Sequence, residues 1–169
     1  ISCSSFENCP DGSEDLTNKL IQLENKIDAL EALLAGVSRG VDPNTSQDTL
    51  TFTNMNVQVV SGSGATDGEI TGTGNLIIGY NELLGDGDER TGSHMLVVGK
   101  ANNYSSFGGM VVGLLNETAN FYASVSGGRN NTASGAVSSV SGGIGNTTSG
   151  DVSSVSGGRN NTAGGYVSS

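Results

Sequence analysis

The chain has 169 residues, of which 27 are glycine and none is tryptophan, and its formal net charge is −10. Only 34% of the residues are hydrophobic and 5% are aromatic, which favours an elongated molecule over a single globular core. The acidic balance argues against nucleic acid or an anionic membrane as a partner. No apolar run approaches the roughly 18–20 residues of a membrane-spanning helix.

The N-terminal segment, residues 1–15, contains both cysteines, Cys3 and Cys9. Their spacing matches no zinc-binding signature, and the single histidine, His94, is far away in the sequence. The two cysteines either form a disulfide, within one chain or between chains, or remain thiols in a frayed terminus.

Residues 16–37 carry a heptad pattern that predicts a coiled coil. The d positions are Leu16, Leu23, Leu30 and Val37, and the a positions are Leu20, Ile27 and Leu34. Lysine at g and glutamate at the following e, five residues later, favour a parallel, in-register coil. Leucine at a and d does not fix the number of helices. The alternative is an amphipathic helix on a globular core, but the sequence offers little core.

Residues 38–75 are predicted to form a connector with short strands. The runs 50–52 and 57–60 are β-like, and glycine-rich turns separate them.

The last part of the chain, residues 76–169, consists of repeats. The motif Ser-Val-Ser-Gly-Gly recurs at Ser124, Ser139 and Ser154, in steps of fifteen residues. Diverged copies begin at Leu76, Leu96 and Met110, and an acidic insert at 85–90 displaces the first of them. A fixed short period predicts a solenoid, here of six turns.

Each repeat centres on a short valine-containing run bounded by Gly and Asn, which is typical of a strand with tight turns. The alternation of a strand sends valine to one face and the flanking serines to the other. We therefore predict that Val98, Val112, Val125, Val140 and Val155 form the repeat core. Because so few large apolar residues occur in each turn, we expect copies of the chain to associate.

The repeats share a central x-V-V-G at 96–99 and 110–113, and S-V-x-x-G at 124–128, 139–143 and 154–158. Together with the coil, they resemble the head of trimeric autotransporter adhesins. The resemblance implies a left-handed parallel β-roll, three copies around one axis, and a surface that binds host matrix or other cells. It also implies an extracellular or cell-surface location on a bacterium. The chain departs from the family pattern in its polar Ser126-Gly127, where the usual repeat is closer to S-V-A-I-G, and in placing the coil first.

No constellation in the sequence predicts catalysis, a cofactor or a metal site. Gly72-Thr73-Gly74 precedes a strand rather than a helix, so it predicts no phosphate loop. The acidic insert lacks the remaining ligands of a calcium loop. The sequons at Asn44, Asn103, Asn116, Asn130, Asn146 and Asn160 are largely products of the repeat.

We therefore expect a mainly β chain, with a short parallel coiled coil followed by a left-handed β-roll, that assembles as a homotrimer. Its expected role is structural or adhesive, as an extracellular fibre that presents a repetitive surface to a host, prey or matrix ligand. The alternative is a subunit of a self-assembling extracellular filament, or a phage-type tail fibre. An uncapped last turn would let solenoids stack end to end.

Overall fold

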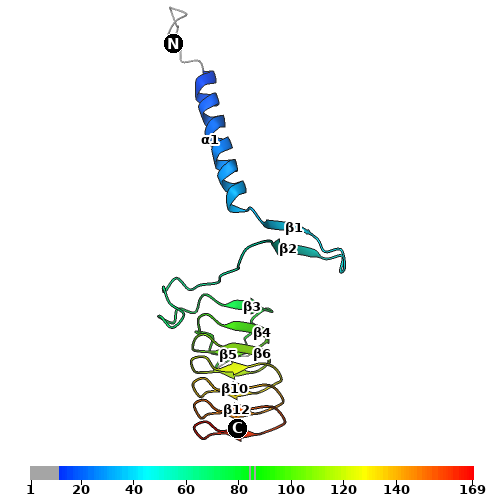
Figure 1. Ribbon diagram of the computed structural model, residues 1–169, viewed down its shortest axis with the longest axis vertical. Helices are drawn as coiled ribbons and strands as arrows, with labels where there is room; N and C mark the ends of the chain where they lie inside the picture. The colour runs from blue at the N-terminus through cyan, green and yellow to red at the C-terminus, as the bar shows by residue number, and fades with distance from the viewer. Residues whose placement is uncertain (1–11, 84, 86) are drawn as a thin grey trace, which may run out of the picture. The chain divides into compact units, whose positions relative to one another are not determined.

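The structure is a computed structural model that describes residues 12–83, 85 and 87–169. It divides into two units, Ile1–Val57 and Gln58–Ser169 (Figure 1). The first unit contains helix α1 (Gly12–Leu33) and strands β1 (Val37–Val41) and β2 (Asp48–Phe52). The second contains β3 (Leu76–Ile78), β4 (Leu96–Lys100), β5 (Asn103–Tyr104), β6 (Met110–Leu114), β7 (Glu117–Thr118), β8 (Ser124–Val125), β9 (Thr132–Ala133), β10 (Ser139–Val140), β11 (Thr147–Thr148), β12 (Ser154–Val155) and β13 (Thr162–Ala163).

Helix α1 ends before the heptad pattern does. The Leu34 carbonyl accepts a hydrogen bond from the Val37 amide at 2.8 Å, and Gly36 takes a φ of 87°. A Cβ at Gly36 would lie 2.6 Å from the Thr53 carbonyl oxygen, so this turn requires glycine. Leu34 therefore lies in the turn after the helix and Val37 begins β1, which places these two predicted coil positions outside the helix.

Strands β1 and β2 form an antiparallel hairpin in which Val37 lies opposite Phe52. The Asp42 carboxylate organises its turn by accepting hydrogen bonds from the amides of Thr45 (2.8 Å) and Asn44 (2.9 Å). The Thr45 amide, the Thr45 hydroxyl and the Asn44 amide hold the pKa of Asp42 below its ordinary value. The turn is therefore most stable above the ordinary pKa of an aspartate, and it loses that support as pH falls through the lowered pKa.

The connector follows its prediction only in part. The run 50–52 lies in β2, whereas 57–60 forms no strand. Later connector residues attach to the repeats instead, since the Ser61 amide donates to Nε2 of His94 at 3.0 Å.

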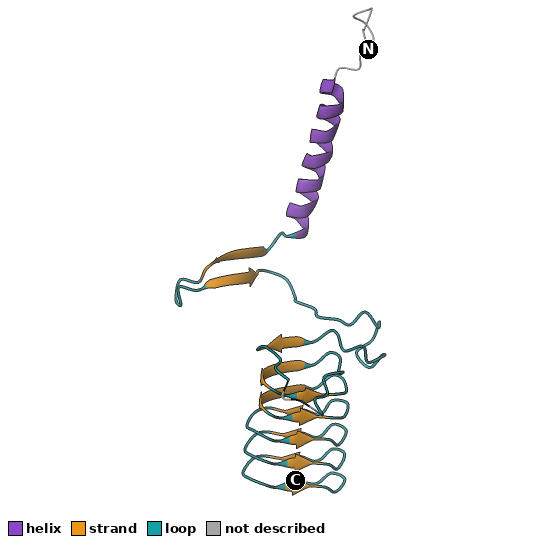
Figure 2. Cartoon of the chain, turned by 180° about the vertical axis from the view of Figure 1, so that it is seen from behind, coloured by secondary structure: helices purple, strands orange, loops and turns teal. Residues whose placement is uncertain are grey.

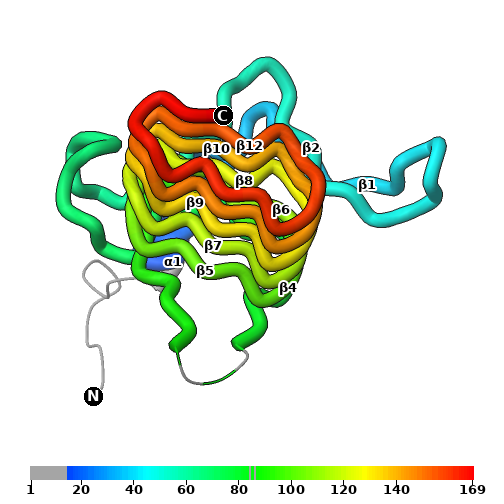
Figure 3. The backbone as a smooth tube through the Cα atoms, turned by 90° about the horizontal axis from the view of Figure 1, so that it is seen from below, coloured from blue at the N-terminus to red at the C-terminus, as the bar shows by residue number. Residues whose placement is uncertain are grey.

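The second unit is a β-solenoid of stacked parallel coils, as the repeat predicts (Figure 2). One sheet has the strand order β12-β10-β8-β6-β4-β3, and the other has the order β13-β11-β9-β7-β5. Ser139 pairs in register with both Ser124 and Ser154, so each turn advances by one fifteen-residue repeat. Viewed along the stack, successive turns superimpose (Figure 3).

The solenoid has about five turns rather than the six predicted. The first copy supplies β3 to one sheet but no strand to the other. In place of that strand, residues at the end of the insert form backbone hydrogen bonds with Tyr104 of the next turn. The Glu89 carbonyl accepts a hydrogen bond from the Tyr104 amide at 2.8 Å, and the Gly92 amide donates one to the Tyr104 carbonyl at 3.0 Å. The insert therefore substitutes for half a turn.

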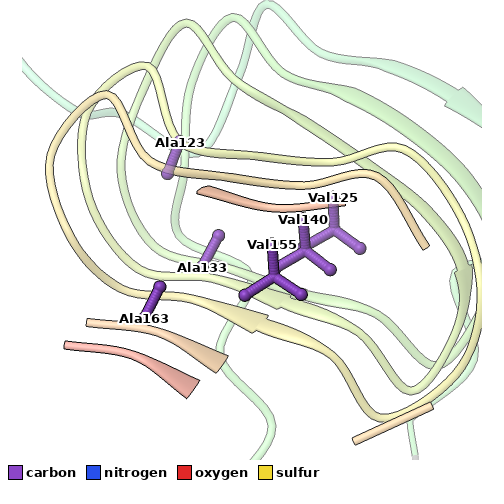
Figure 4. Close-up of a cluster of buried hydrophobic side chains, with 6 residues drawn as sticks. All are labelled: Ala123, Val125, Ala133, Val140, Val155 and Ala163. Atoms are coloured by element: carbon purple, nitrogen blue, oxygen red, sulfur yellow. The ribbon is translucent and has the colours of Figure 1, made fainter. Parts of the chain in front are cut away.

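The interior of the stack contains a column of small apolar side chains. Val125, Val140 and Val155 are buried there as predicted, next to alanines of the facing wall (Figure 4). Further along the column the buried residues are Val97 and Val111, and Val111 pairs in register with Val125. The predicted core residues Val98 and Val112 are only half-buried, because alternation along the strand turns each of them to the outer face.

A ladder of buried asparagines runs beside this apolar column. Asn102, Asn116, Asn131 and Asn146 are each at most 2% exposed. The Nδ2 of Asn146 donates to the carbonyls of Gly142 (2.9 Å), in its own turn, and Gly158 (3.0 Å), in the next turn. Its Oδ1 accepts the amide of Asn161 at 2.9 Å, one rung further on. Asn116 and Asn131 make the same set of contacts, so each rung bonds to its neighbours through one amide side chain.

We predict that Asn146→Ala lowers the free energy of unfolding by about 3 kcal/mol, because it removes three hydrogen bonds of roughly 1 kcal/mol each from a buried site. The control is Asn160→Gly, which removes an exposed amide at a corner where the preceding turn already has Gly145. We expect that change to cost less than about 0.5 kcal/mol. Urea unfolding measures both, and equal losses would contradict the structural role of the ladder.

Candidate interaction surfaces

The outer face of the first sheet changes character along the stack. Six outward side chains on β3, β4 and β6 are apolar, and they form what is called here the apolar face: Leu76, Ile78, Leu96, Val98, Met110 and Val112. Lys100, at the end of β4, is exposed. Leu76 and Ile78 are 51% and 55% exposed, and the other four are half-buried. Large contiguous apolar patches on a protein surface often mark interaction sites, so this face is a candidate for one.

The equivalent outward positions on the later turns are all serines. This serine face consists of Ser124, Ser126, Ser139, Ser141, Ser154 and Ser156. The first serine of each turn is half-buried and the second is exposed, while the valine between them points inward. The hydroxyl columns anticipated from the repeat are therefore present on this surface.

The second sheet presents a single threonine column. Thr132, Thr147 and Thr162 lie in register on β9, β11 and β13, and their outward side chains are partly or fully exposed. The alternate residue Thr148 points inward, where its hydroxyl bonds to that of Ser138 at 3.1 Å.

Helix α1 carries its own uncovered apolar surface, called here the heptad stripe: Leu16, Leu20, Leu23, Ile27 and Leu30. Each of these side chains is between 53% and 62% exposed in the single chain. The first unit places no other described helix against them. These five predicted coil positions therefore lie on one helix with their apolar groups in contact with solvent.

The acidic insert is anchored by one arginine. The Arg90 guanidinium, only 8% exposed, donates hydrogen bonds to the carbonyls of Glu82 (2.6 Å), Asn102 (2.9 Å) and Asn81 (3.3 Å). A positive charge held by three carbonyls fixes the base of the insert against the first complete turns.

His94 is hydrogen-bonded to the backbone through both of its ring nitrogens. Its Nε2 accepts the Ser61 amide, so Nδ1 carries the proton and donates to the Thr66 carbonyl at 3.1 Å. A cavity of about 320 Å³ borders this side chain, but both ring nitrogens are already hydrogen-bonded to the backbone. Within residues 12–83, 85 and 87–169, no three His, Cys, Asp or Glu side chains come together as metal ligands.

Cys3 and Cys9 fall outside the described residues. In the described part of the chain, no helix has the length and apolar character needed to cross a bilayer.

Sequence reasoning did not identify the buried asparagines, because Asn is typical of exposed turns. The repeats do contain the signal. Two turns read Asn-Asn at 130–131 and 160–161, but the middle turn reads Gly145-Asn146. Only the second asparagine recurs in every turn, and only this one is buried wherever a later turn covers it.

No protein-family model, curated protein or solved structure matches this chain.

We predict that Arg90→Met makes the peptide bond after Glu82 at least about tenfold more susceptible to a glutamate-specific protease, because opening of the insert no longer breaks charge-assisted hydrogen bonds. Arg129→Met, at an exposed position, is the matched control. Limited proteolysis followed by mass spectrometry locates the cuts. Unchanged cleavage of the Arg90 variant would show that the guanidinium does not hold the insert.

Proposed function

We propose that this chain is a subunit of a parallel homotrimer that forms a rigid extracellular fibre with a structural or adhesive role. The observation that carries the proposal is the heptad stripe of α1. Five leucine and isoleucine side chains on a single helix are more than half exposed. Each contributes about 1.5–3 kcal/mol when it is fully buried.

Copies of the same helix are the partners that fit this stripe. A 4-3 spacing of apolar residues covers itself when helices associate as a coiled coil, since each knob enters a hole of the facing helix. Most of the stability of helices in proteins comes from packing of their apolar face, so the 22-residue α1 would gain stability from association. The number of three comes from the resemblance of the repeats to trimeric adhesin heads, because leucine at a and d does not select it.

The apolar face supports the same assembly from the second unit. Leu76 and Ile78 are exposed on the first sheet, next to the half-buried Leu96 and Val98. A parallel coil would bring identical solenoids together with the same orientation, so that equivalent apolar faces could cover one another. Left-handed winding of the roll, implied by the resemblance, is part of this proposal.

The remaining outward surface would serve attachment. Serine and threonine columns repeat once per turn on the two sheets, at the spacing of about 4.8 Å between neighbouring strands. A regular array of hydroxyl groups offers many weak, identical contacts to a matrix or cell-surface ligand, and multivalency makes such contacts effective. No step of this function requires catalysis, a cofactor or a metal.

We predict that light scattering of the purified chain gives the mass of three subunits, and that Ile27→Asp gives the mass of one. The substitution would bury three carboxylates in a single layer of the coil. The matched control is Asn25→Asp, which adds the same charge two residues away at an f position, outside the seam, and should remain trimeric.

A monomeric wild type, or an Ile27→Asp variant with unchanged mass, would contradict the trimer. Very large species that shrink with reductant would instead favour the filament alternative, with Cys3 and Cys9 as the link between subunits. For trimers, saturable binding of matrix proteins or cells would then test the adhesive role directly.

A further inference from the structure

Each turn of the solenoid contains two corners at which a residue takes a left-handed backbone conformation. The first corner follows the first sheet and is occupied by Leu115, Asn130, Gly145 and Asn160, with φ values of 59°, 55°, 67° and 56°. The second precedes the first sheet. From β8 onward it is occupied by Tyr122, Val137, Val152 and Val167, with φ values of 55°, 55°, 55° and 53°, whereas the corner before β6 is Gly108, with a φ of 68°. The two corners thus impose the same backbone constraint.

The fold, rather than the side chain, sets this conformation. The Val137 amide donates to the Phe121 carbonyl one turn back at 3.0 Å, and the Val152 amide donates to the Ala136 carbonyl at 2.8 Å. The first corner has the equivalent bond from the Asn130 amide to the Leu114 carbonyl at 3.1 Å. Any residue at either corner is therefore held at positive φ by bonds between turns.

The two corners nevertheless carry opposite residue types. In the last three turns the first corner has Asn, Gly and Asn, the residues that accept positive φ most readily. The second corner has valine each time, whose branched side chain is strained in this conformation. Backbone preference therefore explains the first corner and opposes the second.

Packing within the chain does not explain the valines either. Val137, Val152 and Val167 are 50%, 46% and 63% exposed. Tyr122 is 46% exposed, and its ring also packs edge-on against Phe107 and Phe121 of the same chain. These four residues form an apolar ridge with one side chain per turn, called here the corner ridge. At the three valines, the chain retains strained, exposed apolar groups where a strain-free polar residue would fit.

We propose that the corner ridge packs against a second copy of this chain, as part of the interface between parallel solenoids. The ridge repeats at the strand spacing of about 4.8 Å, so the surface that matches it over four turns is another stack with the same rise per turn. A parallel copy of the same chain supplies that stack. This inference rests on the proposed homotrimer, and it adds to the apolar face a contact along the turns where the first sheet presents serine.

The test is the full-length triple variant Val137→Asn, Val152→Asn, Val167→Asn. Asparagine accepts positive φ better than valine, so each single chain should fold at least as well as the wild type. If the ridge lies between copies, the variant should dissociate at least tenfold more readily in sedimentation equilibrium. The reciprocal control is Asn130→Val, Asn160→Val, which adds strain at the first corner and should lower the melting temperature without weakening assembly.

The outcomes separate the two proposals. A variant that assembles as tightly as the wild type and melts at a higher temperature would overturn the ridge as an interface and leave the trimer intact. A wild type that is monomeric at every concentration would overturn the trimer itself, and the ridge interface with it. Should circular dichroism show that the triple variant has lost its β structure, Val152→Asn alone gives the same comparison.

Discussion

The solenoid depends on the hydrogen bonds of its asparagine ladder. Each buried amide bridges its own turn and the next, and accepts the backbone amide of the following rung. A fully buried polar side chain is stable only when its donors and acceptors are satisfied. Here the partners are backbone groups of the adjacent turns, so the side chain stays satisfied only while those turns remain stacked in register. The apolar interior beside the ladder is small, being valine and alanine in the later turns.

This way of stabilising a stack leaves the outer surfaces free to vary. The interior repeats valine and asparagine, while the outer face of the first sheet passes from leucine, methionine and isoleucine to serine. Three surfaces, the heptad stripe, the apolar face and the corner ridge, leave apolar side chains exposed. Association of identical chains would cover these side chains. The hydroxyl columns that remain in solvent are then the surfaces available to a ligand.

The fifteen-residue step was sufficient to predict a parallel β-solenoid and the burial of Val125, Val140 and Val155, because strand alternation and repeat spacing are local properties. The repeat step did not show whether Val97 or Val98 points into the core, because either of two consecutive valines can be the inward residue of a strand. The register decides it, since Val97 pairs with Val111 and Val111 pairs with the buried Val125. The predicted coil extended past the end of α1 because Val37 continues the heptad arithmetically, although Gly36 turns the chain before it. The ladder and the corner strain depend on contacts between turns, which composition and propensity do not contain.

The most direct test of the account is the distance between equivalent residues of associated chains. The substitution Ser156→Cys, in a chain whose Cys3 and Cys9 are replaced by serine, provides the site for a nitroxide label. Pulsed dipolar spectroscopy of the labelled chains then measures this distance. Parallel, in-register solenoids predict one short and well-defined distance, with a modulation depth that corresponds to three coupled spins. The absence of dipolar coupling, or a broad distribution of long distances, would show that the solenoids do not associate side by side and would contradict the account.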